Sequence, residues 1–314
     1  MHATKAVLII GGSGFIGTHL CQRLRDQYKV FATYHTRRIE IPGVSMIPMN
    51  VTNRNWVKRV IFTTRPDVIV YTAGSGDIRR AEADPHEAEL VNTTGASTVS
   101  NTADLLQCRF IYLSNPYVFD GSKGNYHETD VVLPSTALGK CKVGMENFLK
   151  GKSLNQVIVR SSPVYGRGNG RKLTFLDSLR IRLDSQQRIE LPTTEFHSFV
   201  PITALIDFLV RVVDSGIRHK VLHFGGLTKV TPYDFGLAFA KRFGYDPQYV
   251  LPITPKVERS SYGGESQFSD FSLNSSFIAQ NMKVQPLLLE EGLDHFAQSL
   301  NTKKITLADS VNRR

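Results

Sequence analysis

Four glycines near the start of the chain have the spacing of a turn that binds phosphate groups. The segment Gly11-Gly12-Ser13-Gly14-Phe15-Ile16-Gly17 directly follows the short apolar run 6–10. Glycines at this spacing permit a tight turn, let the backbone approach a pyrophosphate, and allow a helix to pack closely on a sheet. Backbone N–H groups at the helix N-terminus then face the phosphates with a favourable dipole. The position between a strand and a helix predicts a dinucleotide site.

The end of the second apolar run indicates which dinucleotide would bind. The run 29–34 is followed by His35-Thr36-Arg37-Arg38, with no acidic residue before Glu40. NAD sites usually place an acid here for the ribose 2′-hydroxyl, whereas NADP sites offer arginine to the 2′-phosphate. Arg37 and Arg38 also fit a solvated basic loop. Their position favours NADP as the cofactor, with NAD as the alternative.

The elements that must position these residues alternate between strand and helix. We expect buried parallel strands at 6–10, 29–34, 68–71, 109–113 and 156–160. Helices are expected between them, at 18–27, 52–62, 82–106 and 140–150. Such regular alternation predicts an α/β fold with a doubly wound parallel Rossmann sheet.

This alternation ends near residue 165, so we expect two regions and a tail. Residues 1–165 would form the NAD(P)-binding domain. Residues 166–300 would form mainly a smaller C-terminal substrate lobe, with segments that return to the core. Residues 301–314 are polar and are expected to be a flexible tail.

Three segments of the second region have recognisable local patterns. Residues 166–172 are predicted to be a flexible basic loop, and residues 287–300 a closing amphipathic helix. Thr231, Pro232 and Asp234 have the types of a helix N-cap, a first-turn proline and an acidic third position. They predict a helix that continues to about Phe243.

Composition limits the class of protein. A hydrophobic content of 41% and a charged content of 21% are those of an ordinary soluble protein. Cys21, Cys108 and Cys141 are too scattered for a disulfide framework or a metal motif, so we expect a reducing compartment and no metal site. The chain shows neither a signal-peptide pattern nor an apolar run long enough to span a membrane, which predicts a cytoplasmic protein without a membrane partner.

The formal net charge of +10 allows two interpretations. It fits a well-solvated basic surface, and it also fits an attraction for anionic ligands such as a phosphorylated cofactor or an anionic small-molecule substrate. The basic residues are spread along the chain and form no nucleic-acid-binding module. Nucleic acid is therefore not expected as a partner.

Longer stretches of the chain match a known family in order. They are VLIIGGSGFIG at 7–17, PDVIVYTAG at 66–74, ELVNTTG at 89–95, FIYLSNPYVFDG at 110–121, LGKCKVGMENFL at 138–149, RSSPVYG at 160–166 and FVPITALIDFL at 199–209. With them the chain resembles the extended short-chain dehydrogenase/reductases, especially the dTDP-4-dehydrorhamnose reductase-like group of the NAD-dependent epimerase/dehydratase superfamily. That group also includes the regulatory β-subunit of methionine adenosyltransferase. The resemblance implies the Rossmann fold and, in addition, a homodimer formed through helices.

The resemblance also assigns cofactor contacts by position. The residues implied are Gly11, Ser13, Gly14, Phe15 and Ile16 at the pyrophosphate, Asn50 and Val51 at the adenine, Ala73 and Gly74 at the middle of the cofactor, Lys142 at the nicotinamide ribose, and Ser162 and Pro163 near the nicotinamide amide. Asn92 would brace the sheet beside them.

The catalytic positions implied by the resemblance depart from the family pattern. The family uses a Ser or Thr together with a Tyr four residues before a Lys, so that Tyr and Lys share a helix face. The phenol exchanges a proton with the substrate, and the ammonium lowers its pKa. Lys142 fits the lysine position, but Leu138 occupies the tyrosine position and cannot exchange a proton. Asn115 occupies the Ser/Thr position, where its amide can polarise a carbonyl without titrating.

Three hypotheses remain open from the sequence. The first is an NADP-dependent oxidoreductase that acts on a carbonyl or alcohol of a small or nucleotide-linked substrate. Its catalytic residues would be Lys142, Asn115 and a relocated acid, for which Tyr117 is the candidate and Tyr126 and His197 are others. Tyr117 also fits a packing aromatic, and His197 fits a surface-loop histidine.

The other two hypotheses do not involve hydride transfer. One is a cyclisation, dehydration or group transfer on the same scaffold. Cys141 is a weak nucleophile candidate for it because two lysines flank the thiol, but a core or surface cysteine is the favoured interpretation. The last is a catalytically silent regulatory subunit.

Overall fold

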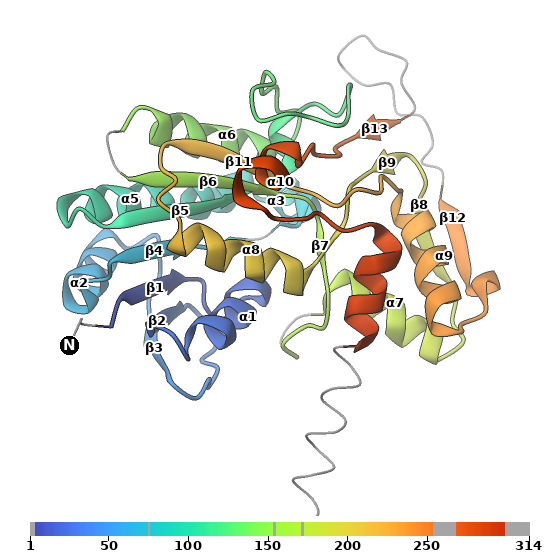
Figure 1. Ribbon diagram of the computed structural model, residues 1–314, viewed down its shortest axis with the longest axis horizontal. Coiled ribbons are helices and arrows are strands. Elements are labelled where there is room, and N and C mark those ends of the chain that lie inside the picture. Colours follow the sequence, from blue (N-terminus) through green and yellow to red (C-terminus); the bar gives the residue numbers. More distant parts are fainter. Residues whose placement is uncertain (1–3, 75, 153–154, 171–172, 254–267, 299–314) are drawn as a thin grey trace, which may run out of the picture.

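The computed structural model describes residues 4–74, 76–152, 155–170, 173–253 and 268–298. Its centre is a seven-stranded sheet with the order β11-β6-β5-β4-β1-β2-β3, in which every neighbouring pair is parallel. The strands are β1 (Ala6–Ile10), β2 (Lys29–Tyr34), β3 (Val44–Pro48), β4 (Val68–Tyr71), β5 (Arg109–Ser114), β6 (Gln156–Ser161) and β11 (Lys220–Phe224). The predicted doubly wound parallel sheet is confirmed (Figure 1).

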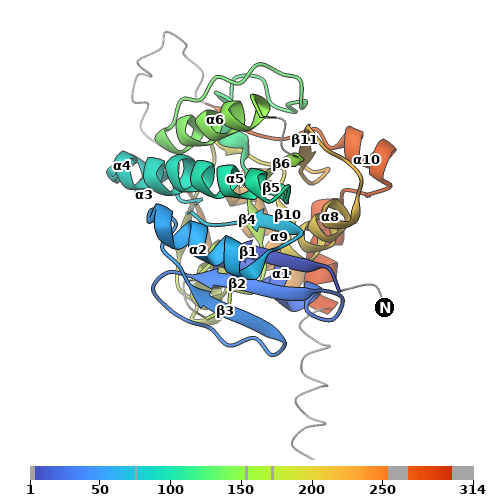
Figure 2. The same cartoon turned by 90° about the vertical axis from the view of Figure 1, so that its left-hand side faces the viewer.

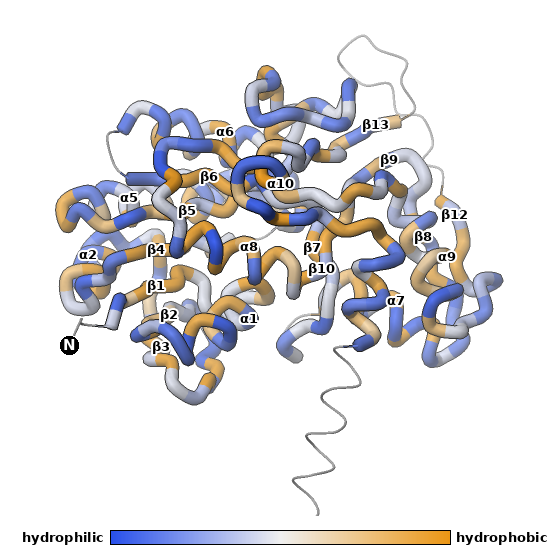
Figure 3. The backbone as a smooth tube through the Cα atoms, in the orientation of Figure 1, coloured by the Kyte–Doolittle hydropathy of each residue, from blue (hydrophilic) through white to orange (hydrophobic). Residues whose placement is uncertain are grey.

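Helices cover both faces of this sheet, because its central strands are apolar on both sides. β1 and β4 are buried along their whole length, as a parallel sheet between two helix layers requires. One face packs on α1 (Phe15–Leu24), α8 (Ile202–Asp214) and α10 (Ser276–Met282), and the other on α2 (Arg54–Thr64), α5 (Ala96–Leu105) and α6 (Ala137–Lys150). Figure 2 shows the two helix layers with the sheet between them, and Figure 3 shows how hydrophobic the strands and α8 are.

Short elements connect β4 to α5. They are α3 (Ile78–Ala83), α4 (Pro85–Glu89) and a π-helical segment (Leu90–Gly95) that runs directly into α5. The sequence predicts one mostly helical stretch here. The structure instead breaks it at Asp84, whose side chain accepts a hydrogen bond from Glu87 N and caps α4.

A third hydrophobic cluster holds together most of the later elements. It contains side chains of α7 (Phe175–Asp184), α9 (Pro232–Phe243) and a helix at residues 289–298. Short parallel pairs complete this region: β7 (Val164–Tyr165) with β10 (Val200–Pro201), β8 (Ile189–Pro192) with β12 (Val250–Ile253), and β9 (Glu195–Phe196) with β13 (Ser269–Asp270). Two 3-10 turns lie at Pro116–Val118 (η2) and Pro247–Tyr249 (η3).

The predicted cap of α9 is confirmed. Thr231 and Asp234 form a reciprocal capping box, with Pro232 at the first helical position. The closing helix is present at residues 289–298, and residues 299–314, which include the predicted tail, lie outside the described residues. The loop 166–172 is described as far as Gly170, and Asn169 anchors it to the glycine turn by donating to Ser13 O (3.1 Å) and Thr18 Oγ1 (2.9 Å).

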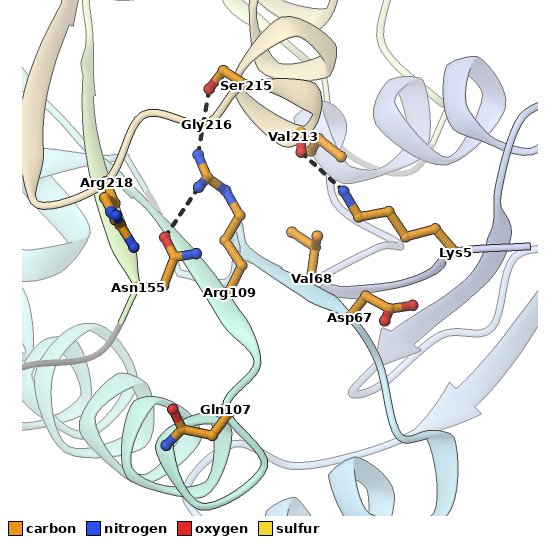
Figure 4. A pocket seen from close by; sticks show the side chains of 10 residues that line it. All are labelled: Lys5, Asp67, Val68, Gln107, Arg109, Asn155, Val213, Ser215, Gly216 and Arg218. Carbon is orange, nitrogen blue, oxygen red and sulfur yellow. Dashed lines mark hydrogen bonds between the residues drawn. The ribbon is translucent and has the colours of Figure 1, made fainter.

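A cavity of about 470 Å³ lies at the amino edge of the sheet (Figure 4). Lys5, Asp67 and Arg109 line it where β1, β4 and β5 begin. The Arg109 guanidinium is already engaged, donating to Asn155 Oδ1 (3.0 Å) and to Val212 O (3.0 Å). We therefore interpret this cavity as a surface recess around a structural arginine, at the edge opposite to the glycine turn.

No helix within the described ranges is long and apolar enough to cross a membrane. In the same ranges, no three His, Cys, Asp or Glu side chains come together as a metal site.

Candidate functional site

The turn between β1 and α1 has the backbone geometry that a phosphate group requires. Gly11 has φ +85°, and a Cβ there would lie 2.7 Å from Ala73 N. A Cβ on Gly17 would lie 2.3 Å from Gly11 O, so the helix packs tightly on the turn. Gly14 is the N-cap of α1, and no side chain of the described residues caps this helix or places an acid in its first turn. The N–H groups of that turn therefore suit an anionic group. α1 begins at Phe15, earlier than the predicted Thr18.

A second part of the site lies at the carboxyl end of β4. Gly74 has φ +112°, and a Cβ there would lie 2.5 Å from Asn92 Oδ1. Asn92 donates from Nδ2 to Ala88 O (2.9 Å), while its Oδ1 is buried without a hydrogen-bond partner in the described ranges. Gly74 thus packs directly against Asn92 at a positive φ, so only glycine fits at this position. The backbone there carries no side chain that would block the middle of an extended dinucleotide.

The residues predicted for the adenosine end lie at the same edge. Arg37 and Arg38 are exposed immediately after β2. Asn50 follows β3 and accepts from Thr52 N (3.0 Å), and Val51 is buried. Because all these strands are parallel, their carboxyl ends bring the predicted positions to one edge of the sheet.

Lys142 and Asn115 meet at the carboxyl end of β5. The Lys142 ammonium donates to Leu113 O (3.0 Å) and lies 4.8 Å from the centre of the Tyr112 ring. Burial lowers the pKa of Lys142 to about 8, against an opposing contribution from Glu146. Asn115 uses Oδ1 to accept from Tyr117 N (3.0 Å), which leaves its Nδ2 without a partner among the described groups. That amide N–H is a suitable donor for a carbonyl oxygen.

Ser162 and Pro163 lie at the end of the next strand. Ser162 is buried, and its hydroxyl lies 2.8 Å from the hydroxyl of Ser198. Pro163 O accepts from Val200 N (3.0 Å). These bonds join the end of β6 to the segment that contains His197.

Leu138 lies in the first turn of α6 and is fully buried. The following residue, Gly139, packs so closely on the 3-10 turn that a Cβ there would lie 2.0 Å from Tyr117 O. The position one turn before Lys142 therefore holds an aliphatic side chain that neither donates nor accepts a proton. The first turn of α6 therefore carries no phenol that could act beside Lys142.

The prediction of a surface histidine at position 197 is wrong. His197 is 3% exposed, because its ring packs against Phe199 (5.5 Å between ring centres) and Phe271 (5.9 Å). Its Nε2 lies 2.7 Å from Glu195 Oε1, and the hydroxyl of Tyr117 donates to the same oxygen (3.0 Å). Two of the predicted acid candidates are thus brought together. Glu195, which joins them, was not singled out from the sequence.

Tyr126 and Cys141 do not join this cluster. The Tyr126 hydroxyl donates to Asp120 Oδ1 (2.8 Å), and its ring stacks on Phe119 at 3.9 Å. Burial, followed by the charge of Glu89, raises the pKa of the Cys141 thiol above 9, and Lys142 only partly opposes this. The expectation that the flanking lysines favour a Cys141 thiolate is therefore wrong, and the core-cysteine interpretation holds.

The fold and the edge just described define a dinucleotide-binding α/β protein of the doubly wound class. The chain belongs to the family described as the RmlD substrate binding domain, which matches residues 5–301. The resemblance to dTDP-4-dehydrorhamnose reductase-like extended short-chain dehydrogenase/reductases is thereby confirmed.

Similar proteins include several reductases. The chain is 29% identical over 241 residues to a dTDP-4-dehydrorhamnose reductase of Aggregatibacter actinomycetemcomitans, covering 74% of this chain and 77% of the relative. It is 24% identical over 315 residues to the enzyme of that name from Mycobacterium tuberculosis, covering 98% and 95%. It is also 23% identical over 258 residues to methionine adenosyltransferase 2 subunit beta of Bos taurus, covering 80% and 75%.

Solved structures share the fold at low sequence identity. The crystal structure of dTDP-4-dehydrorhamnose reductase from Bacillus anthracis in complex with NADP has a TM-score of 0.79 at 20% identity. The match covers 94% of this chain and 99% of the other. At this identity the likeness shows that the two chains share a fold.

Proposed function

We propose that this chain binds NADP and interconverts a carbonyl and an alcohol on a nucleotide-linked, sugar-like substrate. The observation that carries the proposal is the glycine turn with the uncapped α1, at the same sheet edge as Lys142 and Asn115. The reductases among its relatives support the substrate class, and the NADP in the Bacillus anthracis structure supports the cofactor. NAD remains the alternative, since other structural neighbours of this fold are complexes with NAD.

A bound dihydronicotinamide supplies a hydride in this reaction. The residues of the chain bind and orient the two reactants. The turn amides hold the pyrophosphate, Arg37 and Arg38 hold the 2′-phosphate, and Lys142 holds the nicotinamide ribose. Asn115 donates from Nδ2 to the carbonyl oxygen and so stabilises the negative charge that develops there. Excess positive charge on the chain favours an anionic substrate.

The setting of this activity is also a proposal. We expect a cytoplasmic protein, in keeping with the scattered cysteines, and a homodimer of the kind that the family resemblance implies.

A titration of NADPH against NADH tests the cofactor part of the proposal. We expect tighter NADPH binding, lost in the Arg37→Ala/Arg38→Ala variant by roughly ten- to a hundredfold, as charge-assisted hydrogen bonds of about 1.5–3 kcal/mol imply. The matched control is Arg211→Ala/Arg218→Ala, which removes two exposed arginines away from that edge. Equal affinities for the two coenzymes in the wild type would remove the 2′-phosphate argument.

A silent regulatory subunit is the second candidate. The buried Leu138 favours it, as does the similarity to methionine adenosyltransferase 2 subunit beta. It predicts NADPH binding with no turnover and a stable complex with an enzyme partner. Assays of the purified chain with NADPH and a 4-keto sugar nucleotide separate the two candidates.

A further inference from the structure

A cluster of three polar side chains, Tyr117, Glu195 and His197, joins two segments of the chain. Glu195 lies on β9 and Tyr117 in η2, 78 positions away in the sequence. The Tyr117 hydroxyl (3.0 Å) and the Nε2 of His197 (2.7 Å) both approach Glu195 Oε1. An ionised carboxylate only accepts hydrogen bonds, so both partners donate and His197 carries a hydrogen on Nε2.

The members of this cluster differ in their exposure to solvent. The His197 side chain is 4% exposed, whereas that of Glu195 is 34% exposed. The His197 ring also lies edge-on to the Tyr117 ring, with 5.9 Å between centres. Within the described ranges, the other ring nitrogen, Nδ1, is buried without a partner. Of these two side chains, Glu195 is therefore the one that reaches solvent, and His197 contacts its carboxylate from the buried side.

The cluster lies beside the position where the family has its tyrosine. Tyr117 N donates to Asn115 Oδ1, and Tyr117 O lies against Gly139, the neighbour of Leu138. Lys142, one turn further along α6, donates to Leu113 O at the end of β5. The backbone of Tyr117 thus lies between Asn115, whose amide can polarise a carbonyl, and the first turn of α6, which lacks a phenol, while its hydroxyl reaches Glu195.

We propose that Tyr117 and Glu195 form the proton path of this site in place of a tyrosine at position 138, with His197 as a positioning residue for Glu195. This inference rests on the proposed oxidoreductase function. In oxidation, the Glu195 carboxylate takes the hydroxyl hydrogen of Tyr117 while Tyr117 Oη takes the hydroxyl hydrogen of the substrate alcohol. The C–H hydride passes to oxidised nicotinamide dinucleotide as the O–H electron pair forms the C=O bond, and the Glu195 carboxyl then releases its proton to water. Reduction runs the same path in reverse, after the Glu195 carboxylate has taken a proton from water.

The electrostatics of the cluster agree with these roles. Burial, and then the charge and hydrogen bond of Glu195, raise the pKa of Tyr117 well above its ordinary value, so the phenol keeps its hydrogen at neutral pH. Burial raises the pKa of Glu195, but the hydrogen bond and charge of His197, with the hydrogen bond of Tyr117, outweigh it and lower the pKa overall. The resting carboxylate is ionised and faces a protonated phenol.

Kinetics of Tyr117→Phe, Glu195→Gln and the double variant test the path. We expect each single variant to lose kcat by about 10²–10⁴-fold, as loss of a general acid does, with little change in KM for coenzyme. Because both residues act on one proton, the double variant should be no slower than the slower single variant. The matched control is Asp184→Asn, which removes the carboxylate that accepts from Tyr245 (2.6 Å), and it should leave kcat unchanged.

His197→Gln separates positioning from a general structural role. Glutamine can still donate to Glu195, so kcat should fall less than in His197→Ala, while KM for coenzyme stays constant in both. Equal losses in the two variants would overturn the positioning role. Glu195→Asp keeps the charge but shortens the side chain, and it serves as the second variant if Glu195→Gln does not fold.

A readout without coenzyme completes the test. In the apoprotein, a ¹³C-tyrosine NMR titration should show the pKa of Tyr117 falling in Glu195→Gln, because the neighbouring negative charge is gone. If the wild type turns over and kcat is unchanged in Glu195→Gln or Glu195→Asp, the proposed proton path is wrong. The proposed function would still stand in that case. A wild type that binds NADPH but never turns over would remove the proposed function, and the path with it.

Discussion

Glu146→Gln should destabilise the protein far more than the same substitution at a surface glutamate that also pairs with an arginine. Glu146 on α6 accepts from Arg160 through both oxygens, at 3.0 Å from Nε and 2.6 Å from Nη2, and both side chains are 1% exposed. Ser114 donates to Glu146 at 2.7 Å, and His223 lies 3.1 Å from Arg160 Nη1. The neutral amide leaves the Arg160 charge buried without its counterion, which typically costs about 3–5 kcal/mol.

The chain contains a matched control for this substitution. Arg80 donates to both oxygens of Glu87 at 2.7 and 2.9 Å, but these side chains are 57% and 47% exposed. An exposed pair contributes about 0–1 kcal/mol, so Glu87→Gln should have a small effect. Urea unfolding measures both variants, and their m values should stay equal to that of the wild type. If both substitutions lower the unfolding free energy by the same small amount, the argument from burial is wrong.

Three further predictions concern the coenzyme turn, pH and position 138. Gly11→Ala places a Cβ 2.7 Å from Ala73 N at φ +85° and should abolish NADPH binding in a fluorescence titration, whereas Gly216→Ala, with nothing within 4 Å, should not. Burial, and then the charge of Arg160, lower the pKa of His223 from 6.5 to about 3. As the pH falls, the unfolded chain therefore binds a proton at His223 before the folded chain does, and the free energy of unfolding should decrease from about pH 6.5 toward pH 3. His223→Gln should flatten that limb of the urea-midpoint profile, and an unchanged limb would exclude His223 as its source. Leu138→Tyr should raise kcat with a 4-keto sugar nucleotide by less than about tenfold if Tyr117 already supplies the proton, since tenfold corresponds to about 1.4 kcal/mol; a much larger gain would favour the silent-subunit candidate.

The parts of the fold that follow from the sequence are those with strong local patterns. β1 and β4 are short, fully apolar runs, and the glycine turn follows β1 directly. β3 was missed because none of its five residues is fully buried, so it lacks the apolar signal of a central strand. β11 was missed because its place beside β6 depends on the crossover through α8, which no short pattern encodes.

The candidate site likewise contains residues that local sequence patterns predict and residues that they do not. The phosphate turn and Lys142 were predictable, because each belongs to a motif that a few neighbouring residues define. Glu195 carries no such signal, and only the alternation of side chains along β9 and the following residue puts it on one face with His197. Its contact with Tyr117 joins residues from β9 and η2, which tertiary packing alone brings together.

The proton path and Lys142 are held by different elements of the fold. In the family pattern the proton donor and the lysine share one helix, so their geometry is set by α6 alone. In this chain Lys142 is held by α6 and β5, whereas Glu195 and His197 come from β9 and the residues after it. A change in how β9 packs against η2 would therefore lengthen the 3.0 Å bond between Tyr117 and Glu195 while Lys142 stays in place. Substrate contacts with the β9 segment would then control the proton path separately from coenzyme binding, since the glycine turn lies on β1 and α1.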